Sequence, residues 1–296
     1  MRTAFISHLV ERARVNPKIF LVVGDLGYSV VEPFANLFPD RFLNAGIAEQ
    51  NMTGIAAGLA MEGYTVFTYS IANFPTLRCM EQIRYDICYH NLDVKIVSVG
   101  GGYAYGSLGA SHHATEDIGM MRTIPNLIVS APGDPVETRA VLDSLLSTSS
   151  PAYLRLGKAG EPVIHANEII LPVGKSVRVL SGRNTAVLTT GAMLQHSLTT
   201  IQKNNYDFSL YSFPFVKPLD LERLAEISSN YSTVITIEEH QKSGGFGSAI
   251  LEGFNDLLEA GVISKLPTVR RIATPDIFTY TAGSQEYLRK TLDLTF

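Results

Sequence analysis

The chain has 296 residues, of which 46% are hydrophobic and 18% are charged, as is usual for globular proteins. Its formal net charge of -4 argues against nucleic-acid binding, because nucleic-acid-binding proteins present a basic face. The longest apolar stretch, 55–60, is much shorter than the ~20 residues of a membrane span. Charged residues at 11, 12 and 14 interrupt the N-terminal apolar run. We therefore expect neither a membrane segment nor a secretory signal.

The two cysteines, Cys79 and Cys88, lie within one expected helix. A rigid helix holds residues at this spacing farther apart than the ~7 Å between Cα atoms that a disulfide needs. We therefore expect two free thiols and a cytoplasmic location.

Short β-branched runs alternate with helical patterns along the first half of the chain. This alternation is typical of a parallel sheet covered by helices on both faces. We expect strands at 20–23, 65–67, 95–99, 127–130 and 152–156, and helices at 1–16, 48–61, 74–89, 118–123 and 135–147.

Residues 161–182 interrupt the alternation with glycine and proline, so we expect a linker there that contains a strand or two. A second alternating unit follows it. The predicted fold class is α/β, with two doubly wound domains at 1–160 and 183–296. In the second domain we expect strands at 185–189, 208–212, 234–238 and 268–272, and helices at 193–203, 220–228, 249–260 and 284–292.

Two glycine-rich loops, 100–106 and 243–248, follow predicted strands. A dinucleotide-binding fingerprint would place its third small residue at Tyr105 in the first loop and at Ile250 in the second, so neither loop fits. We expect tight turns that approach a neighbouring backbone instead of a nucleotide site.

The adjacent His112 and His113, which have Glu116 and Asp117 nearby, are the only cluster that could suggest a metal site. Structural zinc usually has four ligands at characteristic spacings, and the sequence offers no second cluster to complete such a set. We therefore expect no metal site in this chain.

The segment 44–52, Asn-Ala-Gly-Ile-Ala-Glu-Gln-Asn-Met, places Glu49 in the first turn of an apolar helix. The helix macrodipole alone favours an acid at this position. Gly54 and Gly58 follow on the same helix, and each costs about 1 kcal/mol relative to alanine. That cost suggests a second backbone packed closely against them. From the residues alone, Glu49 is either a helix-stabilising acid or a functional carboxylate.

This segment, with Gly-Ile-Ala-Ala-Gly-Leu-Ala after it, resembles a helix of transketolases, deoxyxylulose-phosphate synthases and the beta subunits of 2-oxoacid dehydrogenases. In those enzymes it carries the cofactor-activating glutamate. The similarity continues through Tyr-Ser-Ile-Ala-Asn-Phe at 69–74 and Met-Glu-Gln-Ile-Arg at 80–84. Gly-Ala-Ser-His-His at 109–113 is similar to the Gly-x-Thr-His-Gln of transketolases. Later motifs, at 215–220, 236–240 and 244–248, resemble the transketolase C-terminal domain.

The resemblance implies that thiamine diphosphate is the cofactor, with its pyrimidine in one domain and its diphosphate in another. Glu49 would hydrogen-bond the pyrimidine ring nitrogen N1′ and favour the imino form of the 4′-amino group, which takes the thiazolium proton. Phe74 would stack on the pyrimidine, and Tyr69 is a weaker candidate for the same wall. Without the resemblance, both aromatic residues would be read as ordinary core and strand residues.

The resemblance also implies substrate contacts. His112 corresponds to the transketolase histidine near the substrate carbonyl, whereas His113 is expected to be scaffold. Lys158 falls where transketolases place a phosphate-binding arginine, and lysine keeps the charge but loses the bidentate fork. Ser29 falls where a serine contacts the sugar phosphate.

The chain also departs from the transketolase pattern. A histidine and an aspartate that contact substrate hydroxyls are replaced by Gly100 and Leu108, which predicts a shorter, less hydroxylated or differently shaped substrate. The Gly-Asp-Gly…Asn segment that holds Mg²⁺ and the diphosphate is missing, and 24–27 is not that motif. Because the phosphates need a metal and backbone donors, we expect a separate N-terminal transketolase subunit in an α2β2 assembly.

The leading hypothesis is the C-terminal subunit of a split transketolase that transfers a two-carbon ketol unit between sugar or sugar phosphate substrates. The alternatives are the beta subunit of a 2-oxoacid dehydrogenase and a decarboxylating carboligase like deoxyxylulose-phosphate synthase. A non-enzymatic homologue is disfavoured because Glu49, Phe74 and His112 occur together. A Rossmann-type oxidoreductase is disfavoured by the two loops.

Overall fold

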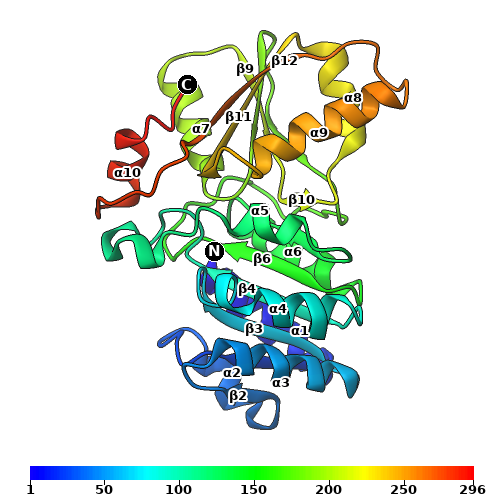
Figure 1. The fold of residues 1–296 in the computed structure, drawn as a ribbon, viewed down its shortest axis with the longest axis vertical. Helices are drawn as coiled ribbons and strands as arrows, with labels where there is room; N and C mark the ends of the chain where they lie inside the picture. The colour runs from blue at the N-terminus through cyan, green and yellow to red at the C-terminus, as the bar shows by residue number, and fades with distance from the viewer.

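The computed structural model describes all residues, 1–296, and contains two sheets stacked along the long axis of the molecule (Figure 1). The first sheet has seven strands in the order β10-β5-β6-β4-β3-β1-β2, and the second has five in the order β12-β11-β8-β9-β7. Helices cover both faces of each sheet. The predicted α/β class with two doubly wound units is therefore confirmed.

In the first sheet, the six strands β1 to β6 pair with one another in parallel, and β10 pairs with β5 in antiparallel orientation. The expected strands and helices are all present except that 74–89 is not one regular helix. Its elements, in chain order, are α1 (Arg2–Val15), β1 (Ile19–Val23), α2 (Glu32–Leu37), η1 (Pro39–Arg41), β2 (Phe42–Asn44), α3 (Glu49–Met61), β3 (Thr65–Ile71), η2 (Leu77–Cys79), α4 (Met80–Gln82), the π-helical turn η3 (Ile83–Cys88), β4 (Val94–Val99), η4 (Gly106–Leu108), η5 (Ala110–His112), α5 (Asp117–Arg122), β5 (Ile128–Ser130), α6 (Pro135–Leu146) and β6 (Ala152–Leu156).

The second unit continues the alternation. Its strand β7 lies inside the range expected to be the linker, yet it pairs with β9 in the second sheet. This strand is one of those expected within the linker, and its pairing attaches it to the second unit. The elements are β7 (Val177–Leu180), β8 (Thr185–Thr189), α7 (Met193–Lys203), β9 (Phe208–Ser212), β10 (Phe215–Lys217), α8 (Leu221–Asn230), β11 (Thr233–Gln241), α9 (Phe246–Glu259), β12 (Thr268–Thr274) and α10 (Gln285–Thr291).

Successive residues of a strand point to opposite faces of the first sheet and therefore belong to two different hydrophobic cores. On β1, Leu21 faces the core under α1 and α6, and Val22 faces the core under α3 and η3. The second of these cores continues into the other unit, where Phe213 and Phe246 belong to it. The two units are therefore packed together through shared apolar residues.

A buried ionic network also joins the units. Arg155 of β6 donates from Nε to Asp117 Oδ2 at 2.7 Å and from Nη2 to the Glu239 carbonyl oxygen of β11 at 3.0 Å. Tyr153 donates to the same Asp117 oxygen at 2.6 Å. The Glu239 carboxylate in turn accepts from Arg289 of α10. Because a buried charge is costly unless it is paired, this network fixes β6, α5, β11 and α10 relative to one another.

Cys79 and Cys88 are both buried and free, which confirms the expectation of two unbridged thiols. Burial raises the pKa of Cys88 to about 12. None of the helices is both long and apolar enough to cross a bilayer.

Candidate active site

The candidate site lies at the edge of the first sheet where the parallel strands β1, β3, β4 and β6 end. Val99 of β4 pairs with Ile71 of β3 on one side and with Leu156 of β6 on the other, so these strands end at the same level. Open α/β sheets bind their ligands at this edge. The loops after these strands and the start of α3 supply the residues described below.

Glu49 is the first residue of α3, and only 2% of it is exposed. Burying a carboxylate is costly unless it is paired, and here Arg78 Nη1 lies 3.1 Å from Glu49 Oε2. A Cβ added to Gly24 would lie 3.6 Å from Glu49 Cγ and 3.4 Å from Ser70 Oγ. The loop after β1 and the end of β3 therefore line the space beside the carboxylate. The Ser70 hydroxyl is buried there without a hydrogen-bond partner.

Phe74 is half-buried in the turn after β3 and lies beside both ionic and aromatic neighbours. The Arg78 guanidinium lies over its ring, 4.9 Å from the ring centre. The His112 ring meets it edge-on, with ring centroids 5.4 Å apart and an interplanar angle of 69°. Arg78 therefore joins Glu49 to Phe74, and Phe74 in turn contacts His112.

Asn73 holds the histidine-containing loop against this cluster. Its Nδ2 donates to the carbonyl oxygen of His113 at 2.5 Å and to that of Ser111 at 3.2 Å. Ser111 Oγ and His112 Nδ1 share a hydrogen bond of 2.9 Å, which orients the imidazole. Burial, together with the neighbouring His113, lowers the pKa of His112. This shift favours the neutral imidazole, which can accept a proton.

Tyr69 does not line this site, contrary to expectation. It is 1% exposed, and its ring stacks on Phe5 of α1 with centroids 6.2 Å apart. Since neighbouring strand residues point to opposite faces, Ser70 faces the Glu49 side of the sheet and Tyr69 faces α1. The assignment of Tyr69 to the pyrimidine wall is wrong, and the residue belongs to the core.

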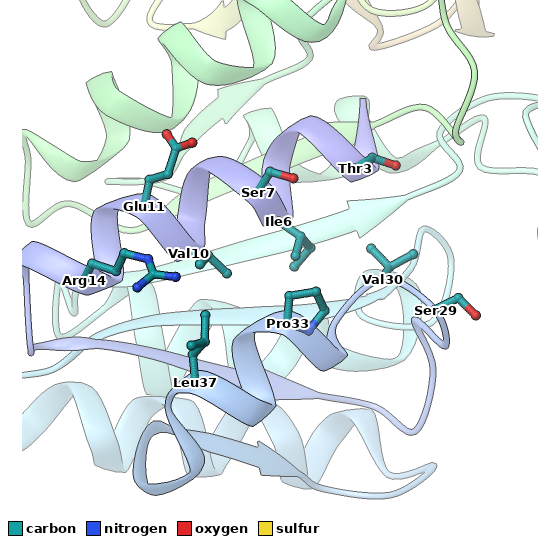
Figure 2. Close-up of a pocket in the computed structure, with 10 residues that line it drawn as sticks. All are labelled: Thr3, Ile6, Ser7, Val10, Glu11, Arg14, Ser29, Val30, Pro33 and Leu37. Carbon is teal, nitrogen blue, oxygen red and sulfur yellow. The ribbon is translucent and has the colours of Figure 1, made fainter.

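Lys158 and Ser29 lie in loops at the same sheet edge, and both side chains are exposed. Lys158 makes no ion pair within the chain. Ser29 is at one end of a groove of about 490 Å³ between α1 and α2 (Figure 2). Its φ is +63°, and its backbone nitrogen donates to Glu32 Oε1 at 2.7 Å. Neither residue touches the cluster around Glu49, so their roles toward a substrate stay predictions.

The first glycine-rich loop packs against side chains. A Cβ at Gly101 would lie 2.5 Å from Arg155 Nε, and one at Gly102 would lie 2.3 Å from Glu239 Oε2. The expected close approach is present, but side chains of the buried network, and not a neighbouring backbone, make it. These glycines bring the loop onto the junction between the two units.

The second glycine-rich loop already holds an anion of its own. The backbone nitrogens of Phe246 and Gly247 donate to Glu238 at 2.6 and 2.8 Å. Burial raises the pKa of Glu238, against the opposing effect of His240 and these donors. The Glu238 carboxyl group therefore takes the backbone donors at the start of α9, which are the donors that a phosphate would need. No group of three or more His, Cys, Asp or Glu side chains is arranged to hold a metal ion.

Arg78 and Asn73 were not among the site residues predicted from the sequence. A signal for Arg78 was available, because positions 74 and 78 share a face of the helix expected there and a cation above Phe74 could have been anticipated. Asn73 lies in the motif at 69–74, but nothing in the sequence predicted its bonds to Ser111 and His113, which cross 38 and 40 residues of chain.

Comparison with known proteins identifies two domains. Residues 1–160 match the family model described as "Transketolase, pyrimidine binding domain", and residues 174–295 match "Transketolase, C-terminal domain". The chain belongs to the transketolase family.

Members of this family that resemble the chain over its length include separate subunits. The chain is 33% identical over 290 residues to one subunit of the apulose-4-phosphate transketolase of Phocaeicola vulgatus, covering 96% of this chain and 90% of the relative. A solved structure described as "Split gene transketolase, inactive beta4 tetramer" is 33% identical with a TM-score of 0.86, covering 99% of this chain and 93% of the other. A 1-deoxy-D-xylulose-5-phosphate synthase of Syntrophus aciditrophicus is 32% identical over 291 residues, covering 96% of this chain but 44% of that longer protein.

The residues at the site fit the aminopyrimidine half of the thiamine diphosphate that transketolases use. Glu49 offers a buried carboxylate that can accept a hydrogen bond, and the Phe74 ring offers an apolar surface beside it. The unpartnered Ser70 hydroxyl on the same side of the sheet is a further polar group that a ligand could satisfy.

Proposed function

We propose that this chain is the C-terminal subunit of a two-component transketolase that transfers a two-carbon ketol unit between sugar or sugar phosphate substrates. The observation that carries the proposal is the cluster in which a buried carboxylate, Glu49, lies near Phe74 and His112 at the sheet edge. The subunit organisation is supported by relatives of matching length that are named as separate transketolase subunits.

Each residue of the cluster would have a distinct task. When bound, thiamine diphosphate supplies an electron sink for breaking and forming the carbon–carbon bond. Glu49 would hydrogen-bond N1′ of the pyrimidine and hold a proton there, and Phe74 would cover one face of that ring. His112, held neutral by burial, would exchange a proton with the substrate oxygen.

When neither cofactor nor partner subunit is bound, Arg78 lies between Glu49 and Phe74. Its guanidinium would have to release the carboxylate before that carboxylate could meet a pyrimidine. Since half of the Arg78 side chain is exposed, the displaced cation can be solvated at modest cost. Arg78 therefore acts as a temporary partner for the buried charge of Glu49.

A second polypeptide would complete the site. We propose an N-terminal transketolase subunit that holds Mg²⁺ and the diphosphate, in a cytoplasmic α2β2 assembly. Within this chain, the expected close packing against Gly54 and Gly58 does not occur, because a Cβ at either position would meet nothing within 4 Å. Met61 at the end of the same helix (58%) and Ile47 just before its start (79%) are also exposed, which supports a partner here.

Deoxyxylulose-phosphate synthase activity is the second candidate, because such synthases are similar to the chain over almost all of its length. Those proteins are more than twice as long as the region matched, since the chain covers 43–44% of them. Relatives matched over 90% of their length are named as transketolase subunits or sections. Chain organisation therefore favours the split transketolase.

Reconstitution tests the proposal. The chain would be mixed with the proposed N-terminal subunit, the one that carries Gly-Asp-Gly…Asn, and with thiamine diphosphate and Mg²⁺. The complex would then be given ketose phosphates as donors and aldose phosphates as acceptors. We expect new ketose products without CO₂ release, and no turnover by either subunit alone. Turnover that requires pyruvate and releases CO₂ would establish the synthase activity instead. Failure of a stable complex to turn over any donor would overturn both.

A further inference from the structure

Asn73 lies in a turn whose backbone is fixed to the end of β4. The preceding residue, Ala72, donates from its backbone nitrogen to the Val99 carbonyl oxygen at 2.8 Å. The carbonyl oxygen of Asn73 itself accepts from the Leu77 nitrogen at 3.2 Å and from the Thr76 hydroxyl at 3.3 Å. The Asn73 side chain therefore extends from a fixed backbone, and only 9% of the residue is exposed.

The amide group of Asn73 matches the two carbonyl groups that it meets. An asparagine side-chain nitrogen carries two hydrogens, and the carbonyl oxygens of Ser111 and His113 can each accept one of them. The reverse orientation of the amide would point its oxygen at two other oxygens, which repel it. The two carbonyls belong to the residues on either side of His112, so Asn73 holds the backbone before and after this histidine.

These two bonds are the only hydrogen bonds between the turn after β3 and the loop 109–113. The other bonds of the loop are made within it or to its near neighbours in the chain, as in the bond from the His113 ring to the Gly106 carbonyl oxygen at 3.2 Å. The other bonds of the turn stay within the turn or reach β4. Removing the Asn73 amide would therefore break the polar connection between the two segments.

The imidazole of His112 has one ring nitrogen left for a ligand. Nδ1 shares a hydrogen bond of 2.9 Å with Ser111 Oγ, whereas Nε2 has no partner within the chain. Nε2 can take up a proton when Nδ1 carries the hydrogen and donates it to the serine. The same ring meets Phe74 edge-on, with centroids 5.4 Å apart. The place of Nε2 relative to the Phe74 ring thus depends on the loop backbone that Asn73 holds.

We infer that Asn73 is a positioning residue for the proton transfer assigned to His112. The role rests on the proposed transketolase function and adds a residue to its mechanism. Asn73 and Phe74 are consecutive, so a single turn sets both the ring that would cover the pyrimidine and the loop that carries the histidine. Asn73 acts through His112 and not on the reacting atoms. Misplacing a catalytic group by about 1 Å can lower turnover about 10²-fold.

Double-variant kinetics of the two-subunit complex test whether Asn73 acts through His112. Asn73→Ala should lower kcat about tenfold to 10²-fold, while the Kd for thiamine diphosphate should change less than about threefold because Glu49 and Phe74 remain. His112→Ala should cause at least as large a loss of kcat. The loss in Asn73→Ala/His112→Ala should be no greater than in His112→Ala alone, since residues that act as a unit are not additive. Losses that multiply would overturn the inference.

NMR titration of the isolated chain provides a readout without cofactor, partner or turnover. Burial, together with His113, lowers the pKa of His112 below 6.5 in the wild type. In Asn73→Ala the loop is released from the turn, so water reaches the imidazole and its pKa should rise toward 6.5. In the control Asn230→Ala, which also removes a bond to a backbone carbonyl (that of Glu226, at 2.9 Å) but in α8, the pKa should stay as in the wild type. An unchanged His112 pKa in folded Asn73→Ala would overturn the inference.

A second variant covers the case in which Asn73→Ala does not fold. Asn73→Ser keeps one hydroxyl donor at this position and should show the same two changes to a smaller extent. Failure of the wild-type complex to transfer a ketol unit would refute the proposed function. Failure of the kinetic and NMR tests in an active complex would refute only the role of Asn73.

Discussion

The guanidinium of Arg78 lies 3.1 Å from the Glu49 carboxylate while it covers the ring of Phe74. Arg78 is half exposed, whereas Glu49 is almost completely buried. The arginine thus neutralises an inaccessible charge from the solvent side. The buried carboxylate of Glu49 therefore has a charged partner at the site.

Replacing Glu49 by glutamine should lower turnover of the reconstituted complex by about 10²-fold or more, the range for removal of a proton-transferring group. The amide has nearly the same shape, so the fold should be preserved. Steady-state assays and circular dichroism would measure the two effects. Glu259→Gln, at the exposed end of α9, is the matched control. Wild-type rates in Glu49→Gln would remove the assigned role.

Replacing Arg78 by methionine should destabilise the isolated chain, because it leaves Glu49 buried without its partner. Losing one member of a fully buried pair costs about 3–5 kcal/mol, and the solvent exposure of Arg78 should reduce this to about 1–2 kcal/mol. Urea unfolding would measure the loss. In the double variant Glu49→Gln/Arg78→Met the loss should be smaller, since no charge is stranded. Strictly additive losses would show that the two residues are not coupled.

The isolated chain should bind thiamine diphosphate weakly. Its candidate site provides a carboxylate and an aromatic ring, whereas we expect the diphosphate to be held by the partner subunit with Mg²⁺. Calorimetry should therefore detect tight binding only after that subunit and Mg²⁺ are added. Submicromolar affinity in the chain alone would contradict the division of the site between two polypeptides.

His165 should make stability depend on pH. Burial lowers the pKa of His165, but the hydrogen bond and charge of Glu137, with the charge of Asp134, more than offset this and raise it above 6.5. Because the folded state then binds the proton more tightly than the unfolded state, the stabilisation is complete below pH 6.5 and is lost as the pH rises through the folded pKa.

Thermal unfolding of the wild type and of His165→Gln across this range would measure the effect. The difference between the two should be largest at low pH and should shrink as the pH rises. The exposed His90→Gln variant should follow the wild type. A difference that stays constant with pH would rule out titration of His165 as the cause.

The sequence predicted the alternation of strands and helices well, because buried runs rich in β-branched residues, such as 95–99 and 185–189, form strands in folds of this class. The resemblance predicted that Glu49, Phe74 and His112 belong to one site. It failed for Tyr69, because a strand's alternation does not reveal which of its faces meets the ligand. The contacts of Asn73 with Ser111 and His113 could not be predicted, since they join segments that lie far apart in the chain.

Strand β10 belongs to the second half of the chain by position but completes the first sheet, where Phe215 pairs with Ser130 of β5 in antiparallel orientation (Figure 1). A fragment that ends at residue 160 would have β5 as an unpaired edge strand. Unpaired edge strands can pair with other chains and cause aggregation. The two domains that match separate family models therefore cannot be exchanged independently of each other. Any chimera with a different second half must supply a strand that pairs with β5 at the edge of the first sheet.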